Sequence, residues 1–424
     1  MQAKFAPALA ADCTVWYNGI RKIQGTGDAR QMRKRELLCT ALLLGGLLAG
    51  CAAATAADPA EPTPAEPVQA VPTPVTVEPT PEARPPEPEP QPLFSEPGAP
   101  ILLFGAWSET RTAADGTLLV DGAAFAAGMG LDYAETEDAA ELRREAARLR
   151  FPLYGEFATA ARQDGVTWIP AVRAAERFGA VQGVTEDGTV YFARVPELAA
   201  PTANVKVPIL MYHAVSDDLW GYWDLFVSPH DLEAQLQYLA DNGYETIWFE
   251  DLSHLEDYEK PVILTFDDGY DDNYTELFPL LQQYQAKATI FVIARDIGGS
   301  HKLDAAQIQE LAASGLVSIQ SHTYSHGNLR LMDEPTLERE MALSQSELAA
   351  LTGQVPYVVC YPEGNYSELT IEVARRYYAY GLLMNGYVYN TLDDPFLVQR
   401  MYIPRGQTSI EWNVRDAGTS DPWR

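Results

Sequence analysis

From residue 206 onward, short apolar runs of strand length alternate with segments of helical periodicity. The apolar runs occur at 207–212, 245–249, 261–266, 288–293, 316–320, 357–361, 381–384 and 400–403. Helical spacing of apolar residues is found at 229–242, 274–284, 304–313, 334–351 and 367–378. This alternation predicts parallel strands joined by crossover helices. About eight strands in roughly 200 residues favour a distorted (β/α) barrel of seven to eight strands at 206–415. An open doubly wound sheet is the alternative.

The preceding segment, residues 101–198, contains an internal repeat. One copy starts at Asp115-Gly116 and the other at Asp164-Gly165, so the offset is 164 − 115 = 49 residues. Each copy predicts a glycine turn, a short strand, a short helix and a glycine stop. We expect a small α+β repeat domain, which resembles the copper amine oxidase N-terminal-like domain of bacterial envelope proteins. The segment has no His or Cys to bind copper, so we expect a spacer or wall-associating role without chemistry.

The N-terminus has the order of parts found in a secretory signal. Basic residues at 33–35 precede an apolar run at 37–48, which is too short for a transmembrane helix. Leu48-Ala49-Gly50-Cys51 then resembles a bacterial lipobox, which implies a signal peptide at 32–51 and lipidation of Cys51. An ordinary signal peptide cut near residues 52–54 is the alternative. Residues 1–31 fit neither pattern, and we interpret them as a misassigned upstream extension.

Residues 52–100 form a linker that holds 15 of the 30 prolines of the chain. Such a segment cannot bury apolar surface, so we expect a disordered, extended spacer. The formal net charge of −29 argues against a nucleic-acid partner and against attraction to an anionic membrane surface. We therefore expect an exported protein that contacts the extracytoplasmic face of the bacterial membrane only through its lipid anchor.

Two polar motifs follow apolar runs inside the predicted barrel. Asp267 and Asp268 follow 261–266, and His322 and His326 follow 316–320. A spacing of four places two histidines on one face of a helical turn, where they can share a metal. One Asp and two His are a ligand set for a catalytic Zn²⁺ that keeps a position open for water, and the second Asp is then free to act as a base. Alternatively, the carboxylates cap a helix beginning near Asn273, a role for which Asp271 and Asp272 are better placed.

At these residues the chain resembles the polysaccharide deacetylases of carbohydrate esterase family 4. Thr265-Phe266-Asp267-Asp268-Gly269 and Ser321-His322-Thr323-Tyr324-Ser325-His326 look like the first two motifs of that family. Pro208-Ile209-Leu210-Met211-Tyr212-His213 looks like the opening strand of its exported members. The resemblance implies Asp267 as general base, Asp268, His322 and His326 as ligands of a divalent metal, most simply Zn²⁺, and N-acetylated polysaccharide as substrate.

The chain departs from the family pattern at two later motifs. The family commonly has Arg-x-Pro-Tyr/Phe-Gly where this chain has Cys360-Tyr361-Pro362-Glu363-Gly364, so a group expected to position the base is missing. The backbone N–H of Glu363 can still stabilise an oxyanion. The family often has a general-acid His near the C-terminus, where this chain has Phe396-Leu397-Val398-Gln399-Arg400. His213 is our candidate for that acid, and a core histidine at the barrel rim is the alternative.

Aromatic residues near the barrel mouth are candidates for sugar stacking. Trp220 and Trp223 in the loop after the first strand, together with Tyr361, are assigned to substrate binding, and packing of the loop onto the barrel is the alternative. We expect Cys360 to be a buried small hydrophobic residue.

The sequence as a whole predicts a metal-dependent hydrolase of linear amides other than peptide bonds. Its expected reaction is removal of N-acetyl groups from amino-sugar polysaccharide of the cell envelope. Two alternatives remain open: a carbohydrate-binding protein with a weak or silent site, and an O-acetyl esterase or other amidase on the same scaffold.

Overall fold

The computed structural model describes residues 94–154, 158–384 and 386–416, which belong to one compact unit. The upstream extension, the signal peptide with Cys51 and nearly all of the linker lie outside the described residues. Within the described part of the chain, none of the helices combines the length and apolar character needed to span a bilayer.

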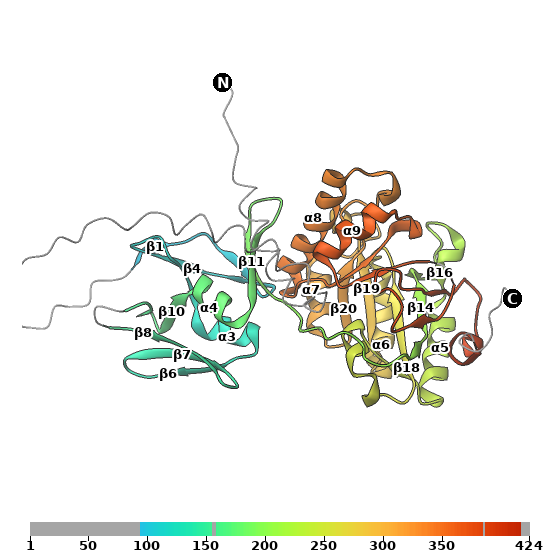
Figure 1. Ribbon diagram of the computed structural model, residues 1–424, viewed down its shortest axis with the longest axis horizontal. Helices are drawn as coiled ribbons and strands as arrows, with labels where there is room; N and C mark the ends of the chain where they lie inside the picture. Colours follow the sequence, from blue (N-terminus) through green and yellow to red (C-terminus); the bar gives the residue numbers. More distant parts are fainter. Residues whose placement is uncertain (1–93, 155–157, 385, 417–424) are drawn as a thin grey trace, which may run out of the picture. The chain divides into compact units, whose positions relative to one another are not determined.

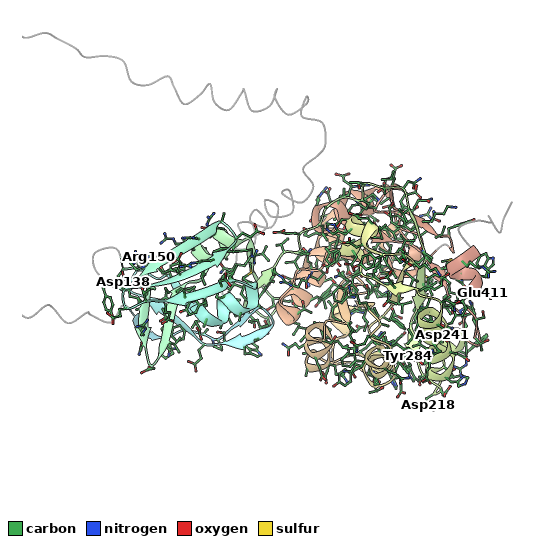
Figure 2. The ribbon with its side chains drawn as sticks, turned by 90° about the horizontal axis from the view of Figure 1, so that it is seen from below. Asp138, Arg150, Asp218, Asp241, Tyr284 and Glu411 are labelled. Carbon is green, nitrogen blue, oxygen red and sulfur yellow. The ribbon has the colours of Figure 1, made fainter. Side chains whose placement is uncertain are left out.

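The first part of the described chain, up to residue 194, is a small α+β domain of two antiparallel sheets, one mixed sheet and two helices (Figure 1). Its elements are β1 (Phe94–Pro97), β2 (Ile101–Leu103), β3 (Ala106–Ser108), β4 (Thr110–Ala113), β5 (Leu118–Asp121), α3 (Gly122–Met129), β6 (Asp132–Glu135), β7 (Ala139–Arg144), β8 (Ala147–Pro152), β9 (Ala161–Gln163), β10 (Val166–Pro170), α4 (Ala171–Phe178), β11 (Ala180–Val184) and β12 (Val190–Arg194). The exposed ion pair between Asp138 and Arg150 on the β7–β8 hairpin (Figure 2) adds little stability, because both groups are well solvated.

The internal repeat appears in the structure as two strand–helix units. β5 with α3 and β10 with α4 are offset by 49 residues (171 − 122 = 49), and each helix ends at a left-handed glycine, Gly130 or Gly179. β5 and β10 pair antiparallel with Val120 opposite Ile169, its own counterpart in the other copy. The two copies therefore meet at a local pseudo-twofold axis.

Residues 206–416 form the second part, a curled sheet of parallel strands in the order β22-β21-β20-β19-β18-β14-β24, with β17 beside β18 (Figure 1). The strands of this part are β13 (Lys206–Val207), β14 (Ile209–Tyr212), β15 (Ala214–Val215), β16 (Phe226–Val227), β17 (Glu245–Thr246), β18 (Pro261–Phe266), β19 (Ala288–Val292), β20 (Val317–Ser321), β21 (Val358–Cys360), β22 (Tyr380–Leu382), β23 (Tyr389–Asn390) and β24 (Met401–Tyr402). The prediction of a distorted (β/α) barrel is confirmed.

The two ends of the curled sheet are joined by the segment from Pro395 to Tyr402. Gly381 N–H of β22 donates to the Pro395 carbonyl, and Val398 N–H donates back to Gly381. Met401 then pairs with Leu210 of β14. This closing segment therefore contacts strands from both ends of the sheet within a few residues.

Five α-helices cover the barrel: α5 (Pro229–Asp241), α6 (Phe278–Tyr284), α7 (Ala305–Ala313), α8 (Glu334–Thr352) and α9 (Glu368–Tyr377). The predicted helix at 274–284 differs, because it begins as a π-helical turn at Asn273–Leu277 before α6. Pro279 has no N–H to donate to the preceding turn, which explains the change of hydrogen-bond pattern. Asp272 stands at the N-terminus of this turn but makes no side-chain cap, so the prediction that it caps the helix is wrong.

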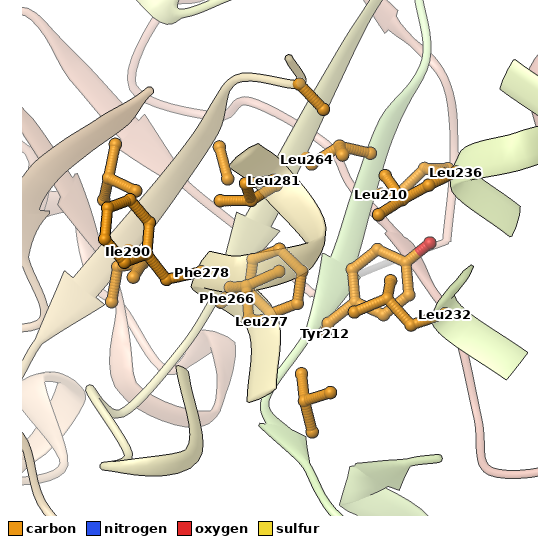
Figure 3. Packing of buried hydrophobic residues seen from close by; sticks show 14 of the residues in the cluster. Leu210, Tyr212, Leu232, Leu236, Leu264, Phe266, Leu277, Phe278, Leu281 and Ile290 are labelled. Atoms are coloured by element: carbon orange, nitrogen blue, oxygen red, sulfur yellow. The ribbon is translucent and has the colours of Figure 1, made fainter. Parts of the chain in front are cut away.

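Apolar side chains pack between the parallel strands and the helices α5 to α7. Figure 3 shows Leu210, Tyr212, Leu264, Phe266 and Ile290 in this cluster, all nearly inaccessible to solvent. Burial of each large apolar side chain contributes about 1.5–3 kcal/mol. The cluster fixes β14, β18 and β19 beneath the polar residues that follow them.

Candidate active site

The carboxyl ends of the parallel strands bring the predicted polar residues together. Asp267 and Asp268 follow β18, His322 follows β20, and His213 follows β14. β14 and β18 are aligned with Tyr212 opposite Phe266, and the Asp267 N–H donates to the Tyr212 carbonyl at 2.9 Å. His213 therefore follows β14 at the level where Asp267 follows β18.

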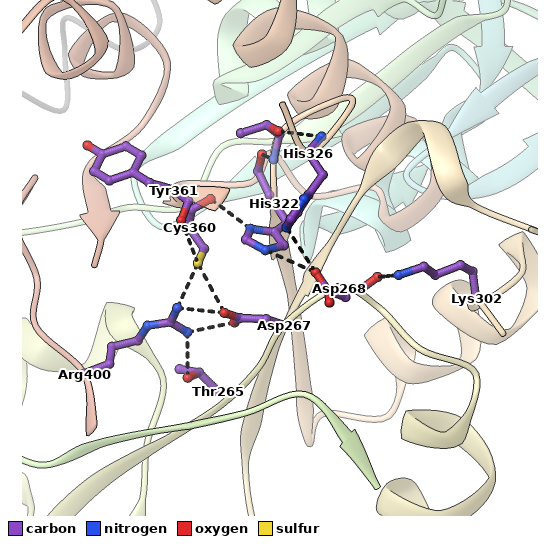
Figure 4. A network of polar contacts seen from close by, with 11 residues as sticks. Thr265, Asp267, Asp268, Lys302, His322, His326, Cys360, Tyr361 and Arg400 are labelled. Atoms are coloured by element: carbon purple, nitrogen blue, oxygen red, sulfur yellow. Dashed lines mark hydrogen bonds and ion pairs between the residues drawn. The ribbon is translucent and has the colours of Figure 1, made fainter. Parts of the chain in front are cut away.

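Asp268, His322 and His326 converge on one point. Asp268 Oδ1 lies 3.4 Å from Nε2 of His322 and 3.4 Å from Nε2 of His326. The two imidazole rings are nearly perpendicular, with centroids 4.8 Å apart. Figure 4 shows both rings directed at the Asp268 carboxylate.

The two histidines do not lie on a helical turn, so that part of the prediction is wrong. Thr323 and His326 both have positive φ, 64° and 57°, which is incompatible with a right-handed helix. The Thr323 N–H donates to Ser321 Oγ, and the His326 N–H donates to Thr323 Oγ1. A hydroxyl-supported loop, rather than a helix, turns the second imidazole towards the first.

These three side chains fit a divalent metal. Ligand atoms about 2.0–2.2 Å from a tetrahedral ion lie about 3.4 Å from one another, which matches both printed separations. His322 Nδ1 lies 2.9 Å from the Cys360 carbonyl, which can only accept, so Nδ1 carries the proton and Nε2 presents its lone pair. Lys302 Nζ donates to the Asp268 carbonyl at 2.9 Å and supports the strained backbone of Asp268, whose φ is 76°.

Asp267 forms a bidentate ion pair with Arg400 (Figure 4). Arg400 Nη1 and Nη2 each lie 2.7 Å from one oxygen of the carboxylate. The guanidinium also donates to Thr265 Oγ1, to the Leu383 carbonyl and to Cys360 Sγ. Both members of the pair are buried, so the orientation of the Asp267 carboxylate is fixed.

The charge of Arg400 controls the protonation of Asp267. Burial alone would raise the pKa of Asp267, but the guanidinium and its hydrogen bonds outweigh burial and lower that pKa to about 2. Asp267 is therefore ionised at neutral pH.

Arg400 contacts the proposed base, a role for which the sequence appeared to lack a group. The third motif carries Cys360 where the family commonly has Arg, and the small thiol leaves room for Arg400 from the closing segment. Burial raises the pKa of Cys360, so this side chain is a neutral thiol beside the guanidinium. Sequence analysis missed Arg400 as a site residue; the signal was a charged residue at the first position of the run at 400–403.

His213 is buried and faces the same centre. Its ring meets Tyr402 edge-on, with centroids 6.3 Å apart. Burial lowers the pKa of His213, and the negative charges of Asp267 and Asp268 oppose that shift. The imidazole is therefore neutral at pH 7 and must gain a proton before it can act as an acid.

The assignment of Tyr361 to substrate binding is wrong. Its side chain is 0% exposed, and its hydroxyl donates to the Phe396 carbonyl. The next residues, Pro362 and Glu363, form the turn after β21, where Glu363 has a φ of 55°. The Glu363 side chain is exposed and accepts from Asn365 Nδ2 at 2.9 Å.

The two tryptophans of the loop after β14 differ in environment. Trp220 stacks on His301 at a centroid distance of 4.3 Å and meets Phe226 and Tyr270 edge-on. This packing favours the structural alternative for Trp220. Trp223 is 63% exposed, and its loop is tied to the closing strand because Tyr402 Oη donates to the Asp224 carbonyl.

Comparison with known proteins places this site in a family. The sequence model of the family described as polysaccharide deacetylase matches residues 254–380. The peptidoglycan-N-acetylglucosamine deacetylase of Bacillus cereus is 32% identical over 191 residues, which cover 42% of this chain and 67% of that protein. The chain belongs to the polysaccharide deacetylase family. YxkH of Bacillus subtilis, whose name assigns it to the same family, is 38% identical over 176 residues, 40% of this chain and 61% of YxkH.

Solved structures of deacetylases are also similar to the present chain. The Streptococcus pyogenes deacetylase PplD, solved in complex with acetate, is 30% identical, with a TM-score of 0.45 and coverage of 48% of this chain and 94% of PplD. BC0361, a polysaccharide deacetylase from Bacillus cereus, is 24% identical, with a TM-score of 0.46 and coverage of 65% and 95%. His213 and Arg400 lie outside the matched family segment of 254–380.

Proposed function

We propose that this chain is a metal-dependent hydrolase that removes N-acetyl groups from amino-sugar polysaccharide of the cell envelope. The observation that carries the proposal is the different environment of two adjacent carboxylates. Asp268 faces His322 and His326 as one metal-binding group, while Asp267 is held apart by Arg400. This is the division that metal-assisted hydrolysis needs, with one carboxylate for the metal and one for a proton.

A divalent ion held by Asp268, His322 and His326, most simply Zn²⁺, would polarise the acetyl carbonyl and acidify the attacking water. Asp267 accepts the proton that the water loses as its oxygen bonds to the carbonyl carbon. The backbone N–H of Glu363 stabilises the negative charge that develops on the carbonyl oxygen. His213 takes up a proton from solvent and then gives it to the nitrogen as the carbon–nitrogen bond breaks, which releases acetate and the free amine.

The names of the relatives support an amino-sugar substrate. Besides the Bacillus cereus peptidoglycan deacetylase, they include the poly-beta-1,6-N-acetyl-D-glucosamine N-deacetylase of Escherichia coli, 29% identical over 136 residues. The chain spans only 20% of that E. coli protein and 61% of YxkH. We therefore propose the substrate class and leave the polymer to experiment.

The test is acetate release by the metal-supplemented protein from four polymers: peptidoglycan, chitin oligomers, poly-N-acetylglucosamine and acetylxylan. Release from one or more of the first three, lost on chelation and restored by Zn²⁺, is the expected result. Release from acetylxylan alone would favour the O-acetyl esterase alternative. Binding without release from any of them would favour a carbohydrate-binding protein with a silent site.

We also propose that the chain is a lipoprotein anchored through Cys51 at the extracytoplasmic face, with the repeat domain as a spacer. The lipobox-like Leu48-Ala49-Gly50-Cys51 supports the anchor. Expression of Cys51→Ser in a bacterial host with labelled palmitate should abolish label incorporation. Incorporation equal to the wild type would contradict this assignment.

Trp223 is our remaining candidate for contact with a second sugar ring. Trp223→Ala is expected to raise KM for a polymer about 5-fold, because stacking of a sugar ring on an exposed aromatic ring contributes on the order of 1 kcal/mol. KM for a small acetylated substrate should not change. Trp107, 64% exposed on β3 of the repeat domain, matches Trp223 at 63%, so Trp107→Ala is the control. Equal effects of both variants would remove Trp223 from the substrate site.

A further inference from the structure

A buried polar cluster lies behind His213 and uses two residues that the proposed mechanism does not involve. Asn273 Nδ2 donates to the His213 carbonyl at 3.0 Å. The Val215 N–H, two residues further on, donates to Asp272 Oδ1 at 3.0 Å. The backbone on both sides of Ala214 is thus held by consecutive side chains from the start of the π-helical turn.

The cluster is internally connected and almost free of solvent. Asn273 Nδ2 also donates to Asp272 Oδ1 at 3.0 Å, and Asn273, Asp272 and His213 are all buried. Burial is the main reason that the pKa of Asp272 is raised to about 6, against the lowering effect of the Val215 N–H. Burying a carboxyl group in this environment costs free energy. A helix that needed only an N-terminal cap would not require a buried carboxyl group at Asp272.

Each of the three residues carries one further polar atom that is buried and has no hydrogen-bond partner within the described part of the chain. These atoms are His213 Nδ1, Asp272 Oδ2 and Asn273 Oδ1. Three hydrogen bonds are the usual number for one buried water. The unsatisfied atoms belong to residues that already contact one another, and one of them is the ring nitrogen of the proposed acid.

We propose that Asp272 and Asn273 are positioning residues for His213, which fix its imidazole towards the catalytic centre so that its proton reaches the departing amine. The inference rests on the proposed function, because it assigns a role within that reaction. It replaces the capping role that the sequence suggested for Asp272. This role makes a specific prediction. Loss of positioning should slow the step in which the leaving group takes up a proton, and it should not slow steps that need no proton.

The leaving group separates these two cases. An amine cannot depart without a proton, whereas 4-nitrophenolate is stable as an anion at neutral pH. Asp272→Ala removes the oxygen that accepts from the Val215 N–H, and Asn273→Ser removes the donor to the His213 carbonyl. Each is expected to lower kcat for an N-acetylglucosamine oligomer about 10-fold or more, since general acid catalysis contributes about 10²–10⁴-fold. Turnover of 4-nitrophenyl acetate should change by less than about 3-fold, because that leaving group needs little acid catalysis.

Asp271 offers a matched control. It precedes Asp272, and its backbone N–H is bonded to the His301 carbonyl, so Asp271→Ala makes the same chemical change one residue away from the cluster. It should leave both activities unchanged. Metal content and melting temperature of all variants show whether folding and metal binding are intact.

A double variant distinguishes positioning from general loss of structure. In a His213→Ala background, adding Asp272→Ala should lower oligomer turnover by less than about 2-fold, because residues that act as a unit are not additive. Asn273→Ser supplies the same cycle if Asp272→Ala does not fold. Parallel loss of oligomer and ester turnover, or full additivity with His213→Ala, would overturn the inference. A wild-type protein that releases no acetate from any amino sugar would instead refute the proposed function, and this role would fall with it.

Discussion

Replacing Arg400 with methionine is expected to lower kcat for acetate release about 10²-fold or more, because the carboxylate of Asp267 loses both hydrogen bonds that orient it. The same change leaves a buried carboxylate without a counter-charge. Removal of one partner of a buried ion pair typically costs about 3–5 kcal/mol of folding free energy. Steady-state kinetics and thermal or urea unfolding measure the two effects separately.

The Arg400→Met variant should also change the pH dependence of stability. In the wild type the folded-state pKa of Asp267, about 2, lies below its unfolded value. The ion pair therefore adds stability that is complete above about pH 4 and is lost as pH falls from about 4 to 2. Without Arg400, burial raises the pKa of Asp267, so the variant should be relatively more stable in acid, and the acidic limb of kcat should move to higher pH.

A second substitution supplies the control for this prediction. Asp267→Asn removes the negative charge, so the double variant Asp267→Asn/Arg400→Met should recover much of the lost stability and none of the activity. Arg330 is exposed on the surface, and Arg330→Met should change neither property. Wild-type kinetics in Arg400→Met would show that Asp267 does not depend on this ion pair.

Separate replacement of the two adjacent carboxylates should divide metal binding from turnover. Asp268→Asn is expected to lose bound metal and activity together, because Asp268 Oδ1 is the oxygen that both imidazoles approach. Asp267→Asn should retain metal and lose turnover by about 10²–10⁴-fold, the usual contribution of a general base. Metal content after dialysis against a weak chelator and acetate release are the measurements.

Asp271→Asn is the neutral control for both variants, because it makes the same change from Asp to Asn within four residues of Asp267 and Asp268. Retained acetate release in both Asp267→Asn and Asp268→Asn would rule out the proposed mechanism. Loss of metal in both variants would mean that Asp267 also serves the metal, in which case its pairing with Arg400 would need another explanation.

The sequence predicted the strands and the site residues that directly follow them. The run at 261–266 corresponds to β18 (Pro261–Phe266), and its polar continuation supplied Asp267 and Asp268. Local periodicity carries such information because the carboxyl ends of parallel strands share one edge of the barrel. Arg400 was missed because its partner lies 133 residues away and only the closed barrel brings them together.

Conformation at single residues was the other source of error. The four-residue spacing of His322 and His326 suggested a helix, but positive φ at Thr323 and His326 builds the same convergence from a loop. Tyr361 was placed in the substrate site from its motif, but its hydroxyl finds the Phe396 carbonyl in the interior. Aromatic residues of a motif can thus be structural.

The position of the closing segment in the chain determines when the candidate site becomes complete during synthesis. Arg400 is synthesised after Asp267, Asp268, His322 and His326. A nascent chain can therefore contain the proposed base and metal ligands without the guanidinium that pairs with the base. Only the docking of residues 395–402 between β22 and β14 supplies the guanidinium. The oriented form of the proposed base therefore arises only once residues 395–402 have docked.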